Sequence, residues 1–172
     1  MWIKNIMKNL SYYNLTEKKL EQLCSTISDV LLASKLDTLQ FGLSGELGAG
    51  KTTWMRYFLE NLGYSGKVVS PTYTLLEEYN VNDINLIHVD LYRLIDPNSE
   101  QEFESLGLRE RIACPSTWIF VEWAERVKSL YYSLDLILML SFSGNQNRDI
   151  NFIAKTSKGY NILSSIGKSE FP

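Results

Sequence analysis

The sequence predicts a three-layer α/β fold, in which helices cover both faces of a mixed, mainly parallel β-sheet. Apolar segments of strand character alternate with helical segments around a glycine-rich loop at residues 45–52. A turn at Asn82–Asp83 joins two strand-like segments and predicts an antiparallel hairpin. The apolar run Trp118–Glu122 is typical of a strand that is buried on both faces of a sheet.

The elements around the glycine-rich loop follow from hydrophobic periodicity. A helix is predicted after Thr16, which is a suitable N-cap residue, because apolar residues follow it at the i, i+3, i+4, i+7 spacing. A strand at residues 39–44 enters the loop, and a helix that begins near Lys51 leaves it and ends at Gly63. The apolar residues of the first helix are Leu20, Leu23, Cys24, Ile27, Val30 and Leu31.

The rest of the chain supplies the remaining strands. Strands are predicted at residues 67–69, 73–80, 86–90, 118–122, 136–142 and 150–154. Asp96–Pro97 opens a helical stretch that runs through Phe103.

Size and composition indicate one domain over residues 1–172, with a core at about residues 12–160. Charged residues make up 22% of the chain and its formal charge is −3, which argues against nucleic-acid binding by this chain alone. Cys24 and Cys114 form no metal or redox pattern, which favours reduced thiols and a cytoplasmic location. No targeting segment is predicted in residues 1–10, and the apolar run Leu134–Phe142 is too short to cross a membrane.

The glycine-rich loop matches the phosphate-binding pattern G-x-x-x-x-G-K-[ST] at every fixed position, and its strand and helix flanks are those the pattern requires. Its glycines let backbone N–H groups turn inward around an anion, at the positive end of the helix dipole. The Lys51 ammonium would reach the β- and γ-phosphates, and the Thr52 hydroxyl would bind Mg²⁺. We therefore expect a nucleoside triphosphate site on a P-loop NTPase-like fold. The loop consists of Gly45, Glu46, Leu47, Gly48, Ala49, Gly50, Lys51 and Thr52.

Two acidic residues, Asp90 and Glu122, each follow an apolar strand. Ligands of open α/β sheets gather at the carboxyl ends of strands, and a P-loop enzyme needs a second acid there to hold Mg²⁺ or its water. Either residue alone could be a solvated carboxylate at a strand end. Glu122 follows the cleaner apolar run and is the preferred metal-side acid, while Asp90 could position water or contact the metal.

Other polar side chains leave alternatives open. The hydroxyls of Ser70–Thr74 could reach Mg²⁺ or phosphate, or they could belong to a plain turn. His88 in an apolar strand is better explained as a packed, hydrogen-bonded residue than as a base, and Trp123 suits stacking and core packing equally. The nearest guanine-reading pattern, Ser34–Asp37, precedes the loop instead of following it, so ATP is preferred to GTP. Any of four arginines could neutralise phosphate charge: Arg93, Arg109, Arg126 and Arg148.

Four segments in this order resemble the bacterial TsaE (formerly YjeE) family. They are residues 45–53, Ser70–Leu75, His88–Leu94 and Val121–Trp123, and the likeness spans about residues 12–160. Many families share the loop, whereas the combination of the second and third segments is far more specific.

The resemblance implies a role for each matching residue. It makes Lys51, Asp90 and Glu122 catalytic and places Thr52, Asp90 and Glu122 at Mg²⁺. Nucleotide contacts would extend from the loop through Thr53 to a switch-like hydroxyl on Thr72 or Thr74. Trp123 matches the family tryptophan, and two looser matches put Arg148 near the nucleotide and Thr16 at the adenine side.

The resemblance also implies an activity and partners. Proteins of this family bind ATP and Mg²⁺, hydrolyse ATP slowly alone, and associate with the TsaB–TsaD pair. That pair transfers a threonylcarbamoyl group to adenosine 37 of tRNA (t6A), so tRNA would be met only through the complex, and ATP hydrolysis would reset it. The acidic stretch Ser99–Gly107 keeps the acidic character of the family, but its spacing is slightly extended. This departure affects what the resemblance implies for the partner-contact surface and not for the ATP site.

Two other classes of function fit the loop. A small-molecule kinase would need an acceptor pocket and an arginine-rich lid, and the sequence shows no arginine cluster of that kind. A nucleotide-gated binding module would bind its partner in an ATP-dependent way, with hydrolysis incidental.

Overall fold

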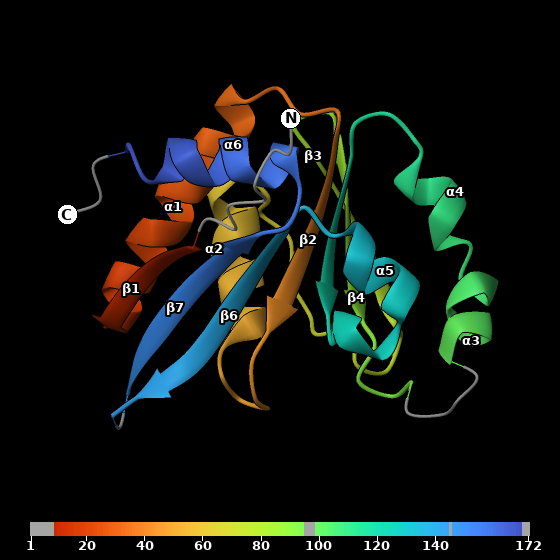
Figure 1. Ribbon diagram of the computed structural model, residues 1–172, viewed down its shortest axis with the longest axis horizontal. Coiled ribbons are helices and arrows are strands. Elements are labelled where there is room, and N and C mark those ends of the chain that lie inside the picture. Colours follow the sequence, from red (N-terminus) through yellow and green to blue (C-terminus); the bar gives the residue numbers. More distant parts are fainter. Residues whose placement is uncertain (1–8, 95–98, 145, 170–172) are drawn as a thin grey trace, which may run out of the picture.

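The computed structural model describes residues 9–94, 99–144 and 146–169, and these residues form a seven-stranded sheet. Its strand order is β1-β7-β6-β2-β5-β4-β3, and β6, β2, β5 and β4 pair in parallel at its centre. β1, β7 and β3 each pair antiparallel with a neighbour, so the predicted mixed, mainly parallel α/β sheet is confirmed (Figure 1). The strands are β1 (Asn9–Leu15), β2 (Thr38–Ser44), β3 (Leu76–Val81), β4 (Ile84–Asp90), β5 (Thr117–Glu122), β6 (Leu136–Ser143) and β7 (Asn147–Ala154).

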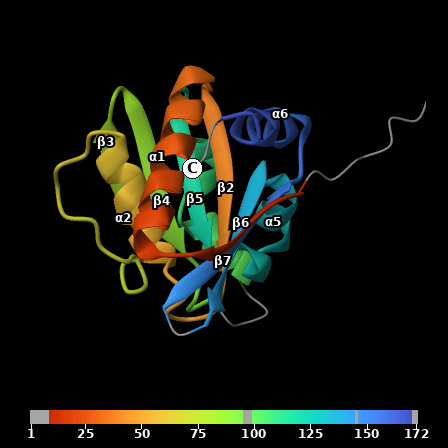
Figure 2. The same ribbon diagram turned by 90° about the vertical axis from the view of Figure 1, so that its left-hand side faces the viewer.

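Helices cover the two faces of the sheet and bury a separate apolar cluster on each. In Figure 2, α1 (Glu17–Ala33) and α2 (Lys51–Asn61) lie on one side of β2, and α5 (Lys128–Ser133) lies on the other. The apolar residues of α6 (Ser157–Ile166) join the cluster of α1 and α2. The second cluster lies beneath α3 (Ser99–Ser105), α4 (Leu108–Ile112), the short 3₁₀ helix η1 (Ala124–Arg126) and α5.

Strand β5 is buried at all six positions, as its apolar run predicts. Successive side chains of a strand point to opposite faces, so Trp118 and Phe120 pack in the first cluster while Ile119 and Val121 pack in the second. β5 lies between β2 and β4, and this places Glu122 at the carboxyl end of a strand that is two positions from the β3 edge of the sheet.

The predicted helix boundaries and hairpin agree closely with the structure. The Thr16 side chain caps α1 by accepting a hydrogen bond from the Lys19 backbone N–H at 3.4 Å. α2 begins at Lys51, and Gly63 follows its end with a φ of +95°. Asn82 and Asp83 have φ values of +50° and +60°, which suit the tight turn between two antiparallel strands.

One predicted strand is wrong, and another begins three residues too early. Residues 67–69 form no strand, and residues 73–75 belong to a turn, so that β3 begins only at Leu76. The Val69 backbone bonds to the Tyr79 hydroxyl instead of to a neighbouring strand, with both contacts at 3.4 Å. Residues 67–69 therefore belong to the loop that leads to residues 70–72.

The sequence analysis did not predict four elements of the structure: β1, α4, α5 and α6. The predicted helix start at Asp96–Pro97 lies outside the described residues, and α3 covers the rest of that helical stretch. Most of the N-terminal segment 1–10 also lies outside the described residues. Within the described ranges, none of the helices combines the length and the apolar character that crossing a membrane requires.

Asp135 joins α6 to the sheet. Its carboxylate accepts hydrogen bonds from the Gln40 N–H at 3.0 Å and the Thr156 hydroxyl at 2.8 Å, and it pairs with the Lys158 ammonium at 2.8 Å. Thr156 in turn caps α6 by accepting from the Gly159 N–H at 3.1 Å. The charge that interrupts the apolar run before β6 is therefore a structural anchor.

Candidate active site

The glycine-rich loop connects β2 to α2 at the carboxyl end of the sheet, and its backbone explains its glycines. Gly45 has a φ of +144°, and a Cβ atom at this position would lie 2.4 Å from the Leu140 carbonyl oxygen of β6. Gly50 has a φ of +109° directly before the first residue of α2. Both conformations are open to glycine and strained for other residues, which explains why glycine stands at these two positions of the loop.

Lys51 is buried, with its side chain 5% exposed, and its ammonium lies inside the loop. It donates hydrogen bonds to the carbonyl oxygens of Gly45 at 2.8 Å and Glu46 at 3.2 Å. It also lies 3.8 Å from Glu122 Oε2 and 4.8 Å from the centre of the Trp123 ring. The ammonium is thus surrounded by acceptors that a phosphate could replace.

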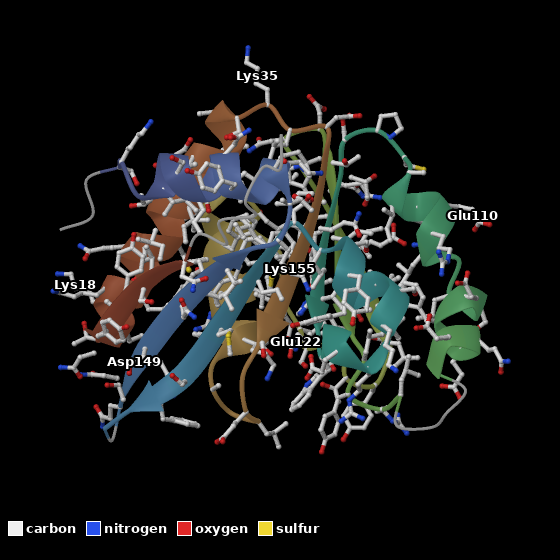
Figure 3. The ribbon with its side chains drawn as sticks, viewed as in Figure 1. Lys18, Lys35, Glu110, Glu122, Asp149 and Lys155 are labelled. Atoms are coloured by element: carbon white, nitrogen blue, oxygen red, sulfur yellow. The ribbon has the colours of Figure 1, made fainter. Side chains whose placement is uncertain are left out.

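Asp90 and Glu122 lie side by side at the ends of two parallel strands. They are register partners between β4 and β5, and Glu122 is also the partner of Leu43 at the end of β2. Both are almost fully buried, and in Figure 3 Glu122 lies near the end of β2. The structure thus brings the two predicted acids together beside the loop, with Glu122 on the strand next to the loop strand.

Asp90 is held by the segment that the sequence singled out for its hydroxyls. The Thr72 hydroxyl donates to Asp90 Oδ2 at 2.5 Å, and the Tyr92 N–H donates to Oδ1 at 2.8 Å. Ser70 bonds to Thr72 at 2.8 Å. Thr74 instead donates to the exposed carboxylate of Glu77, so Thr72 is the hydroxyl at the site and Thr74 is not.

These groups line one cleft of about 280 Å³. Its walls are the loop and the start of α2 on one side and the ends of β4 and β5 on the other. The predicted residues Thr52 and Thr53 line it, while Tyr92 and Trp123 form an aromatic wall whose ring centres lie 5.3 Å apart. The lining residues are Leu47, Gly48, Gly50, Lys51, Thr52, Thr53, Ser70, Thr72, Asp90, Tyr92, Glu122 and Trp123.

A second depression opens behind the loop and contains the two looser predictions, Thr16 and Arg148. Arg148, on β7, donates through Nε to the Ala49 carbonyl oxygen at 2.8 Å and so touches the loop directly. Tyr57 and Asn147 also line this depression and had no role in the prediction. The sequence could have indicated Tyr57, because it lies on the predicted helix that follows the loop. In the structure the Tyr57 hydroxyl donates a hydrogen bond to Glu17 at 2.7 Å.

The structure distinguishes among the four candidate arginines. Arg126 lies over both aromatic rings of the cleft wall, 5.4 Å from Trp123 and 5.5 Å from Tyr92. Arg109 pairs with Glu104 on the α3–α4 surface, and Arg93 lies over the exposed Tyr73 ring. Arg148 and Arg126 are therefore the two that adjoin the candidate site.

His88 is fully buried and hydrogen-bonded, as the sequence indicated. Its Nε2 lies 3.1 Å from Glu122 Oε1, so His88 contacts a residue of the candidate site. The sequence did not predict this contact.

The donor set suits Mg²⁺ bound together with phosphates. Among residues 9–94, 99–144 and 146–169, there is no cluster of three or more His, Cys, Asp or Glu side chains that could hold a metal by themselves. Two carboxylates and the Thr52 hydroxyl do line the same cleft. Mg²⁺ is commonly bound by one or two carboxylates with substrate phosphates and water, so this smaller set fits it.

Comparisons with known proteins agree on one family. The family model described as threonylcarbamoyl adenosine biosynthesis protein TsaE matches residues 15–150. A Haemophilus influenzae protein named tRNA threonylcarbamoyladenosine biosynthesis protein TsaE is 36% identical over 162 residues, which cover 92% of this chain and 98% of that protein. The protein of the same name from Bacillus subtilis is 38% identical over 112 residues, with coverage of 65% and 67%. The crystal structure of Bacillus subtilis YdiB aligns with a TM-score of 0.74 at 24% identity, covering 96% of this chain and 98% of that one, and supports the fold.

Proposed function

The chain belongs to the TsaE family, and we propose that it binds ATP with Mg²⁺ and hydrolyses the ATP in the service of tRNA t6A biosynthesis. The observation that carries this proposal is the meeting of Lys51, Asp90 and Glu122 in one cleft at the N-terminus of α2. A helix N-terminus and a buried ammonium attract a triphosphate, and two adjacent carboxylates suit the metal that accompanies it.

The chain's own groups have separable tasks in this proposal. The loop N–H groups and Lys51 bind the β- and γ-phosphates, for which the Lys51 ammonium exchanges its bonds to the Gly45 and Glu46 carbonyl oxygens. Thr52, Glu122 and Asp90 would hold Mg²⁺, which when bound neutralises charge on the phosphate oxygens. The ring of Trp123 covers Lys51 and limits the access of water to it.

Asp90 and the Thr72 hydroxyl are suited to orienting an attacking water. Their 2.5 Å bond fixes the carboxylate at the edge of the cleft, and both line it. In phosphoryl transfer the protein contributes chiefly positioning and electrostatic stabilisation, so a held carboxylate is the group the reaction needs.

The nucleoside end of ATP would lie in the depression behind the loop. Thr16 and Arg148 line this depression, and Arg148 contacts the loop backbone. This arrangement supports the expectation that these two residues lie near the base and ribose.

The partners we propose are proteins of the TsaB–TsaD type. The relatives named for t6A biosynthesis support a role in that pathway, and tRNA would be reached through the complex. We expect slow hydrolysis by the chain alone and faster hydrolysis in the complex.

Calorimetry with MgATP tests the site. Lys51→Ala should weaken binding, because it removes the buried cation, while Glu122→Ala should retain binding and lose hydrolysis. Lys67→Ala removes the same charge as Lys51→Ala from an exposed loop position and serves as the matched control. Failure of the folded parent chain to take up MgATP, even with the partner pair present, would overturn the proposal.

The pathway role needs a test in cells. Deletion of the gene should lower t6A in bulk tRNA, and the parent gene but not the Lys51→Ala variant should restore it. Unchanged t6A in the deletion strain would reject the role while leaving ATP binding to be judged by calorimetry.

A further inference from the structure

His88 is the only histidine of the chain, and it lies against the carboxylate that we propose as the metal-side acid. His88 and Asp90 are two residues apart on β4 and therefore point to the same face of the sheet. Their register partners on β5 are Phe120 and Glu122, so the imidazole lies two residues before the pair of acids along the strands, on the same face of the sheet.

The two oxygens of Glu122 have different surroundings. Oε1 lies 3.1 Å from His88 Nε2, away from the cleft, and Oε2 lies 3.8 Å from the Lys51 ammonium. The carboxylate is thus held at one oxygen, while the other is directed to the position where phosphate would bind.

Hydrogen-bond accounting selects one tautomer of the neutral imidazole. A carboxylate oxygen only accepts, so Nε2 must carry the proton that joins the pair. His88 Nδ1 is buried and has no partner among the described residues. A proton on Nδ1 instead would leave a buried donor unpaired and set a ring lone pair against the Glu122 oxygen, which is costlier on both counts.

We propose that His88 is a positioning residue for ATP hydrolysis, which holds Glu122 Oε1 through its Nε2–H so that Oε2 faces the bound phosphates and metal. This inference rests on the proposed function, because it takes Glu122 as the acid at the metal. His88 itself is fully buried and touches no solvent, so it acts through Glu122. Groups that orient a ligating residue in this way typically change activity by about 10–100-fold when removed.

The contact can be tested without any enzymatic activity. The chain has a single imidazole, so ¹⁵N-histidine NMR of the parent reports the protonation of His88 without overlap. We expect Nε2 to be protonated and its signals to shift in Glu122→Gln. An unprotonated Nε2, or a spectrum that Glu122→Gln leaves unchanged, would overturn the inference.

Kinetics then separate positioning from simple packing. His88→Leu fills the space without a donor and should lower kcat by about 10–100-fold while leaving the KM for ATP near the parent value, because the hydrogen bond of His88 goes to Glu122 and not to the loop or Lys51. His88→Gln keeps an N–H donor and should restore most of kcat. Ile87→Val, on the same strand but in the opposite core cluster, should lower the melting temperature and leave kcat unchanged.

Parent-like kcat in His88→Leu, or equal loss in His88→Leu and His88→Gln, would reject the positioning role. If His88→Leu fails to fold, the NMR experiment and the His88→Gln variant still decide the question. A parent chain that hydrolyses no ATP with its partners would count against the proposed function, and the NMR result would still decide the contact between His88 and Glu122.

Discussion

Replacing Gly159 with alanine should destabilise the protein, although helix propensity alone predicts the opposite. Gly159 lies in the first turn of α6, where alanine would be favoured over glycine by about 0.8–1 kcal/mol. A Cβ atom at this position, however, would lie 1.9 Å from the Asp135 carbonyl oxygen and 2.8 Å from its carbonyl carbon. Carbon–oxygen contacts are ordinarily no closer than about 3.3 Å, so α6 would have to move by about 1.4 Å.

The surroundings of Asp135 decide the magnitude. Its backbone is fixed on both sides, because its N–H donates to Gln40 at 2.8 Å and its carbonyl oxygen accepts from Lys155 at 2.9 Å. Overpacking against such a neighbour costs about 3 kcal/mol, the upper end of the usual range, and the gain in propensity leaves a net loss of about 2 kcal/mol. For a chain of this size that loss corresponds to a melting temperature roughly 4–8 °C lower.

Thermal denaturation followed by circular dichroism measures this effect. Asn161→Ala is the matched control, because it lies on the exposed side of the same helix and gains propensity without a new contact. The control should melt at or slightly above the parent temperature. If Gly159→Ala melts as high as the parent, α6 does not approach Asp135 as closely as described, and the argument fails.

Three further predictions concern the loop and the Glu100 carboxylate, which accepts hydrogen bonds from the Ser129 N–H and hydroxyl in the first turn of α5. Gly45→Ala should abolish MgATP binding in calorimetry while the chain stays folded, because its Cβ would meet the Leu140 carbonyl; parent-like affinity would contradict the loop geometry. Lys51→Arg should bind MgATP at least about tenfold more weakly than the parent, since a planar guanidinium cannot replace a compact ammonium that is buried between loop carbonyls; equal affinity would show that charge alone suffices. Hydrogen bonds from Ser129 lower the pKa of the Glu100 carboxyl, so its contribution to stability is complete above its ordinary pKa of about 4.3 and is lost as the pH falls through the lowered value. The stability difference between the parent and Glu100→Gln, measured by urea denaturation, should therefore shrink on acidification from pH 7 to about 3, and a difference that grows would refute this.

The parts of the site that local chemistry dictates could be predicted from the sequence. Gly45 and Gly50 adopt backbone angles that few other residues tolerate, and Lys51 directly follows Gly50 at the start of α2. Asp90 and Glu122 could be paired because each ends a buried strand, and parallel strands end at the same edge.

Contacts between distant segments could not be predicted in this way. No local pattern indicates that Thr72 bonds to Asp90 or that His88 bonds to Glu122, because both depend on the pairing of strands that the sequence does not order. The strand predicted at residues 67–69 was wrong because apolar residues alone do not supply a neighbouring strand. α6 was missed because Gly159 weakens the helical pattern. Glycine is needed at this position because the helix passes close to the Asp135 carbonyl group.

The position of β1 at the edge of the sheet bears on how the protein is made. In the part of the chain that the structure describes, β1 pairs with β7 alone, and Ser11 bonds to Asn151, 140 residues further along the chain. A ribosome that adds roughly 5–20 residues per second needs about 7–28 s to cover that distance. Throughout that interval β1 has no β7 to pair with, so this edge of the sheet forms only after β7 has been synthesised.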